Sequence, residues 1–119
     1  MEEFKLFNAE SKFLNIIWEL EPINSTELAK ECLEKLGWKK STTYTMLRKL
    51  SERNIVKNET TMVTSLIKRE QVQKMESEAL LEKSFGNSLP SFLAAFLQGK
   101  KITEKEVDEI KKMVEEAME

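Results

Sequence analysis

Hydroxyl and basic side chains concentrate in residues 38–54, which read WKKSTTYTMLRKLSERN. At helical spacing the apolar members share one face with Thr43, and the polar members occupy the rest. From residue 38 to residue 57 there are six Lys and Arg against one acid, although the whole chain has a net charge of -2. One face is therefore suited to packing against a core. The other presents hydrogen-bond donors and positive charge, as a DNA-reading helix does. The inward residues are Thr43, Met46, Leu47 and Leu50; the outward ones are Ser41, Thr42, Tyr44, Thr45, Arg48 and Lys49.

Length and composition limit what else the chain can hold. Its 119 residues suffice for one domain with a core, or for a small domain with an oligomerisation element. Charged residues make up 34% and hydrophobic ones 40%, with three Gly and two Pro, so helix should dominate. No apolar run approaches a membrane span, and the amino terminus is too charged for a signal peptide. We expect a cytoplasmic protein with no membrane partner.

Residue types also argue against an enzyme. The chain has no His, which removes nucleophile–histidine catalysis and the commonest metal ligand. Its one cysteine, Cys32, lies in a helical pattern near Ala29 and Leu36, without the cationic neighbours that activate a thiol. We interpret Cys32 as a packing residue and expect no catalytic residue, no metal site and no cofactor.

Two helices should precede the basic stretch. The first is predicted from Asn8, as its cap, to Leu20, before Pro22. In the second helix, Asn24 is the amino-terminal cap, and Gly37 ends the helix. The basic stretch follows as a third helix, about Lys40–Asn54, which gives helix-turn-helix order; an ordinary helical hairpin with a solvated charged face is the alternative.

A hairpin is predicted directly after the third helix. Residues 55–58 and 62–66 are short β-branched runs separated by Glu59, Thr60 and Thr61. Three helices and a hairpin make a winged helix. The tip lacks the Asn-Gly or Asp-Gly of a tight turn, and Glu59 would repel phosphate, so the wing should add little DNA affinity.

The rest of the chain returns to helical periodicity. A fourth helix is predicted from Lys68 to about Ser84, a very apolar fifth around Leu89–Leu97, and a sixth with Thr103 as its cap. These helices have too little chain to enclose their own phenylalanines, so we expect a symmetric partner subunit to cover them; packing back onto the winged helix is the alternative. The expected dimerisation residues are Val72, Met75, Leu81, Phe85, Leu89, Phe92, Leu93, Phe96, Val107, Ile110 and Val114.

The predicted fold class is therefore mainly α with a small β-hairpin: a winged helix-turn-helix domain, residues 1–68, followed by a three-helix dimerisation region, residues 69–119.

With this order the chain resembles the penicillinase-repressor family of bacterial transcription regulators. The likeness rests on AESKFLNIIW, on Trp38 with TTYTMLRKL, on Ser65-Leu66 after the wing, and on FGNSLPSFLAAFLQGKKITEKEVDEI. It implies a homodimeric repressor on an inverted-repeat operator, with Thr42 and Thr45 matching threonines that touch DNA.

Three departures limit what the resemblance carries over. Val63-Thr64-Ser65 stands where the family has a Tyr-x-Pro segment, so wing contacts are not transferred. Ala79-Leu80 aligns with the Asn-Phe bond that a sensor protease cuts in resistance regulators, and the Cys-x-Cys pairs of copper-responsive relatives are missing. The sequence names no inducer, no regulatory protease and no operator sequence.

The predicted function is DNA-binding transcriptional repression, with the third helix in the major groove. The alternative is a winged-helix protein-interaction module that does not read DNA sequence. Arg48 can pair with a guanine edge or a phosphate, and Tyr44 can meet a thymine methyl or merely pack. Lys39, Lys40, Lys49 and Lys57 should chiefly contact phosphates. The full set of expected DNA-binding residues is Lys39, Lys40, Ser41, Thr42, Tyr44, Thr45, Arg48, Lys49 and Lys57.

Overall fold

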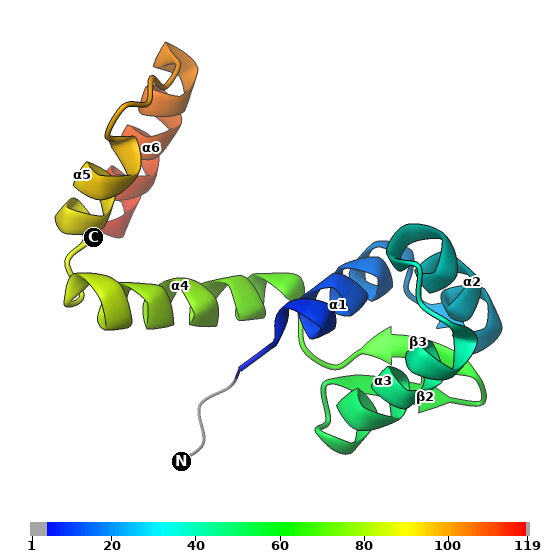
Figure 1. The fold of residues 1–119 in the computed structure, drawn as a ribbon. Coiled ribbons are helices and arrows are strands. Elements are labelled where there is room, and N and C mark those ends of the chain that lie inside the picture. Colours follow the sequence, from blue (N-terminus) through cyan, green and yellow to red (C-terminus); the bar gives the residue numbers. More distant parts are fainter. Residues whose placement is uncertain (1–4, 119) are drawn as a thin grey trace. The chain divides into compact units, whose positions relative to one another are not determined.

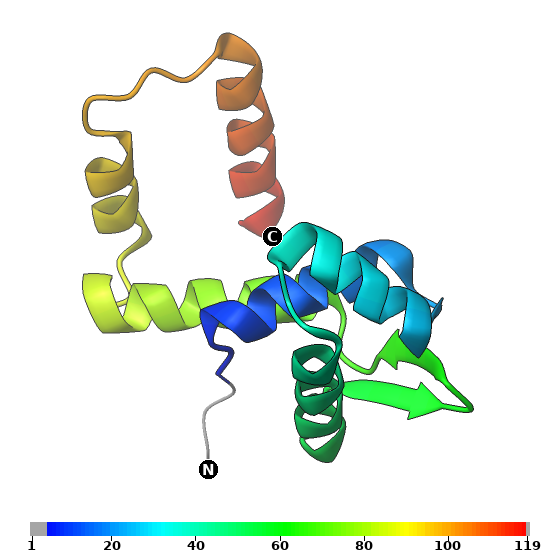
Figure 2. The ribbon, with the colours of Figure 1, turned by 45° about the vertical axis from the view of Figure 1, so that its right-hand side comes forward.

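The computed structural model describes residues 5–118, which form a set of helices and one small sheet. Figures 1 and 2 show the ribbon from two directions. The predicted fold class, mainly α with a winged helix-turn-helix arrangement, is confirmed. The elements are α1 (Asn8–Leu20), β1 (Ile23–Asn24), α2 (Ser25–Leu36), α3 (Lys40–Glu52), β2 (Val56–Glu59), β3 (Met62–Ser65), α4 (Arg69–Phe85), α5 (Leu89–Leu97) and α6 (Glu104–Ala117).

The first three helices enclose the core of the winged helix. α1 contacts α2, α2 contacts α3, and strand β3 lies against α1. Apolar side chains at helical spacing provide the contacts: Phe13, Leu14, Ile16 and Ile17 from α1, Leu28 and Cys32 from α2, Leu47 and Leu50 from α3, and Ile23, Ile55, Val56 and Val63 from the strands and their connections. Cys32 is buried, as predicted.

The helix ends follow local rules with two corrections. The side chain of Asn24 caps α2 by accepting from the Thr26 N–H at 2.8 Å, as predicted. The prediction of Asn8 as the cap of α1 is wrong by one residue: Phe7 holds that position, and its N–H donates to Glu10 at 2.9 Å. α3 ends at Glu52, two residues before the predicted Asn54, and Asn54 adopts the left-handed conformation with φ 58°.

The sheet has one strand more than the predicted hairpin. Its order is β1-β3-β2, and both pairings are antiparallel, with Ile23 opposite Val63 and Lys57 opposite Thr64. β1 is two residues long, too short to show an alternating pattern. At the hairpin tip Thr60 and Thr61 have φ 51° and 64°. Both are therefore left-handed, as in the tight turns that usually contain Asn-Gly.

The chain divides into two compact units, one that reaches Ser77 and one that begins at Glu78, so the boundary falls inside α4. In the first unit, the Trp18 indole N–H donates to the Ile67 carbonyl at 3.0 Å, and the Arg69 guanidinium lies 5.5 Å from the Trp18 ring. Val72 is only 3% exposed. The first turns of α4 are thus held by the winged helix.

The second unit contains the rest of α4 together with α5 and α6. Thr103 caps α6 as predicted and accepts from the Glu106 N–H at 3.1 Å, and Ser88 caps α5 by accepting from the Ser91 N–H. The Phe92 ring packs edge-on against Phe85 and stacks on Phe96, with centroids 5.4 and 5.7 Å apart. α5 and α6 stand apart in Figure 2, joined by the segment between them.

Candidate nucleic-acid interface

α3 is positioned by contacts at its start and along its inner face. At the start, Gly37 takes the left-handed φ of 69° that reverses the chain after α2, and the Trp38 ring stacks on Phe13 at 5.7 Å. Inside, Thr43, Leu47 and Leu50 are buried. These contacts hold the inner face of α3 against the core, so the rest of its surface faces outward.

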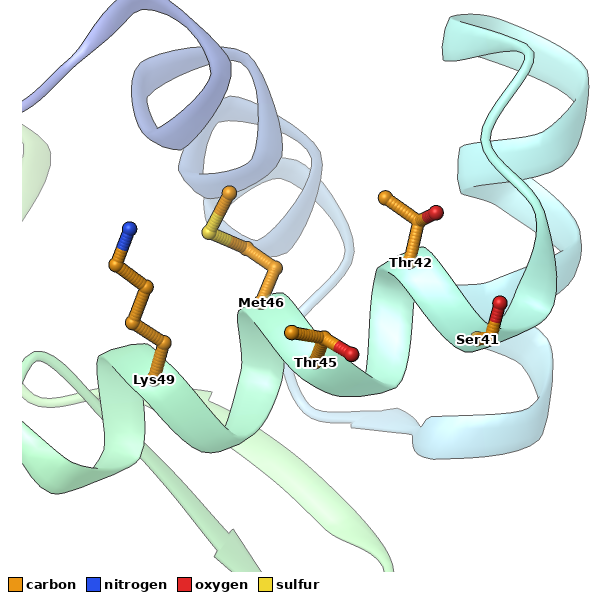
Figure 3. Close-up of a pocket in the computed structure, with 5 residues that line it drawn as sticks. All are labelled: Ser41, Thr42, Thr45, Met46 and Lys49. Atoms are coloured by element: carbon orange, nitrogen blue, oxygen red, sulfur yellow. The ribbon is translucent and has the colours of Figure 1, made fainter.

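The outward face of α3 carries hydroxyl and cationic groups. On α3 and at its first cap, the predicted contacts that are exposed are Lys39, Lys40, Ser41, Thr42, Thr45, Arg48 and Lys49. Figure 3 shows that Ser41, Thr42, Thr45, Met46 and Lys49 project from the same side of the helix. They line a shallow depression of about 270 Å³. Such a row offers donors for base edges and charges for phosphates, on a helix that fits a major groove.

Tyr44 lies at the edge of this surface. Its ring is half-buried and packs against the core, and the Lys40 ammonium lies 5.8 Å from its centroid. The part of the Tyr44 ring that packs against the core is therefore not available to contact DNA. Its predicted contact with a thymine methyl stays a prediction.

Lys57 lies on β2 and not on α3. Its ammonium lies 2.7 Å from the Glu59 carboxylate on the same strand, and both side chains are exposed. The hydrogen bond and the charge of Lys57 lower the pKa of Glu59 below its usual value. The positive charge predicted for this part of the wing is thus balanced locally.

Sequence reasoning missed two features of this surface. Met46 was expected to face the core, but it is half-buried and also lines the depression, because it lies at the border of the two faces of α3. Arg53 contributed to the predicted basic cluster, yet its guanidinium donates to the Glu10 carboxylate at 3.0 Å. Glu10 lies 43 positions earlier, and no local pattern connects the two residues.

Comparison with known proteins agrees with this geometry. Residues 6–116 match the family described as Penicillinase repressor. The chain belongs to the penicillinase repressor family. A curated relative, the penicillinase repressor of Bacillus licheniformis, is 23% identical over 116 residues, which cover 94% of this chain and 91% of the relative. The family is one of transcriptional repressors and not of enzymes.

This penicillinase repressor family member has a second surface of interest, on residues 78–118. None of these residues is buried, although several are large and apolar. Of the predicted dimerisation residues, Leu89, Phe96, Ile110 and Val114 are exposed, and Met75, Leu81, Phe85, Phe92, Leu93 and Val107 are half-buried. Leu80 and Met113, which were not in the predicted set, are 47% and 64% exposed. Val72 and Met75 lie in the first unit, and Val72 is already buried there.

Two further properties concern other kinds of site. Burial raises the pKa of the Cys32 thiol above its ordinary value, which opposes formation of a reactive thiolate. In residues 5–118 no helix combines the length and apolar character that a membrane crossing requires.

Proposed function

We propose that this chain is a DNA-binding transcriptional repressor that acts as a homodimer on an inverted-repeat operator, with α3 in the major groove. The observation that carries the proposal is the exposed row of hydroxyls and cations on a helix whose inner face is locked by Thr43, Leu47 and Leu50. A rigid helix can keep donors in register with base edges. Membership of a repressor family supports the same role.

Within this proposal the α3 side chains have distinct tasks. Ser41, Thr42 and Thr45 present hydroxyls to base edges, with Arg48 beside them. Lys39, Lys40 and Lys49 neutralise phosphates and fix the register of the helix. Tyr44 and Lys57 contribute less, because the tyrosine ring packs on the core and the lysine is paired with Glu59.

The homodimer is supported by the second unit. Its helices bury no side chain by themselves, yet Leu89 and Phe96 are about half exposed, at 49% and 50%. Exposed apolar surface of this kind marks an association site. A symmetric pair of subunits would also hold two α3 helices at the fixed spacing that a two-fold operator needs.

The alternative, a protein-interaction module, lacks a matching surface on α3. A partner-binding helix would present apolar or acidic side chains, whereas the exposed side of α3 carries Lys40, Arg48 and Lys49. Retention of genomic DNA fragments by the protein separates the two functions. A repressor selects a small set of fragments, and an interaction module selects none.

Salt dependence tests the DNA-reading function quantitatively. If a dimer neutralises six or more phosphates, affinity for a selected fragment should fall by roughly 10³ or more between 50 and 200 mM salt. Fluorescence anisotropy with a labelled duplex measures this directly. A response that is flat across that range contradicts the proposal.

A further inference from the structure

Glu10 is a buried acid at the edge of a basic surface. Its side chain is 1% exposed, and among residues 5–118 it is the one charged side chain that is buried. Burial of a carboxylate is unfavourable unless hydrogen bonds and opposite charges surround it. The position therefore needs a reason beyond helix capping.

One nearby backbone N–H and two cationic side chains from a distant part of the chain meet at this carboxylate. The Phe7 N–H donates to one oxygen at 2.9 Å. The Arg53 guanidinium donates to the other at 3.0 Å, and the Lys49 ammonium lies 3.7 Å from that same oxygen. A second guanidinium nitrogen of Arg53 donates to the Lys5 carbonyl at 2.8 Å. Arg53 thus bridges the amino-terminal segment and Glu10.

The arrangement joins the ends of two helices. Glu10 is in the first turn of α1, where the helix dipole favours a negative charge, and Lys49 is in the last turn of α3, where it favours a positive one. Arg53 immediately follows α3. The carboxylate therefore fixes the carboxyl-terminal end of α3 against α1, while Trp38 and Phe13 fix its other end.

We propose that Glu10 is a positioning residue for DNA recognition. Its carboxylate holds the end of α3 and partly neutralises the charges of Arg53 and Lys49. This inference rests on the proposed DNA-reading function. A cation that is shared with a buried carboxylate attracts phosphate less strongly than a free one. Glu10 thereby lowers affinity for arbitrary DNA and preserves the orientation that selective binding requires.

The test compares two duplex probes on the full chain. One is a fragment that the wild-type protein retains from genomic DNA, and the other is a random-sequence duplex of equal length. Glu10→Gln removes one negative charge with little change of shape. We expect binding to the random duplex to become at least about 3-fold tighter, with a salt slope steeper by about one ion per subunit. The ratio of selected to random affinity should fall at least about 5-fold.

Glu34→Gln is the matched control, because it removes the same charge at an exposed position of α2. It should change neither the slope nor the ratio. If Glu10→Gln instead weakens both probes by one factor with an unchanged slope, Glu10 is a purely structural residue and the proposal is overturned.

Arg53→Lys provides an independent test that keeps the charge constant, and it decides the question if Glu10→Gln does not fold. A lysine cannot reach Glu10 and the Lys5 carbonyl together. The salt slope should stay as in the wild type, and the selected-to-random ratio should again fall at least about 5-fold. An equal loss on both probes, or no loss, overturns the proposal. A wild-type protein that retains no fragment contradicts the repressor function itself, which is a distinct result.

Discussion

The Lys57 ammonium and the Glu59 carboxylate lie 2.7 Å apart on strand β2, one residue on either side of Asn58. The side chains of alternate residues share a face of a strand, so this pairing follows from the strand itself. It leaves the outer strand of the wing without free positive charge at these two positions. The wing should therefore bind DNA weakly.

The pair predicts effects of different size for two substitutions. Lys57→Ala should change affinity for a random duplex by less than about 3-fold, because its charge is already shared. Glu59→Gln should tighten that affinity and steepen the salt slope by up to about one ion per subunit. Anisotropy titrations at several salt concentrations measure both. A large loss with Lys57→Ala would mean that the lysine leaves Glu59 to contact phosphate.

Arg48 is the exposed guanidinium in the hydroxyl-rich row of α3. Arg48→Ala should cost about 1–3 kcal/mol on a selected fragment and relax preference at one position per half-site, if the side chain reads a base. Competition with fragments that carry single base changes measures that preference. Lys105→Ala, in α6, is the control and should leave DNA affinity unchanged. Uniform weakening on every sequence would assign Arg48 to a phosphate.

The hairpin tip holds Thr60 at φ 51°, a conformation that strains a β-branched residue. Thr60→Asn should raise the free energy of unfolding by about 1 kcal/mol, because Asn tolerates this region and suits the turn. Urea unfolding followed by circular dichroism gives the value. Thr60→Val keeps the branched carbon and should bring no gain. Equal stability of the two variants would show that the tip is not strained.

The sequence predicted the elements whose signals are local. Asn24 caps α2, Gly37 ends it, and Thr103 caps α6, because each acts through its own side chain or backbone. The exposed row on α3 followed from helical spacing in the same way. The residue at the border of two faces, Met46, could not be assigned by spacing alone.

Features that depend on distant residues were not predictable. Thr60 and Thr61 form a turn that local preference disfavours, and the Ser25 N–H and the Asn24 amide both donate to Thr61 from the start of α2. β1 forms because Ile23 and Asn24 pair with β3, which lies far along the chain. Glu10 meets Arg53 for the same reason. Tertiary contacts, absent from any short window, decided these cases.

The Cys32 thiol predicts a pH-dependent stability. Burial raises its pKa in the folded protein, whereas the unfolded thiol titrates near 9.0. As pH rises above that value the unfolded chain loses a proton that the folded chain retains, so stability falls. Cys32→Ala removes this component. The difference in unfolding free energy between wild type and Cys32→Ala should therefore narrow from about pH 8 to about pH 10. A constant difference would mean that the thiol pKa is the same in both states.

The exposed apolar side chains of α6 predict how the dimer would be broken. Ile110 and Val114 are one turn apart and are 39% and 48% exposed. In a symmetric dimer, Ile110→Gln with Val114→Gln removes four buried side chains. At about 1–1.5 kcal/mol each this loss should weaken dimerisation by more than about 10³-fold.

Sedimentation velocity at micromolar concentration would show the variant as a monomer. Its affinity for a selected DNA fragment should also fall, because the two α3 helices are then no longer joined. Lys111→Gln with Glu115→Gln alters polar positions of the same helix and should leave the dimer intact. A wild-type protein that sediments as a monomer at that concentration would contradict the dimer, and the repressor would then have to bind each half-site with a single α3.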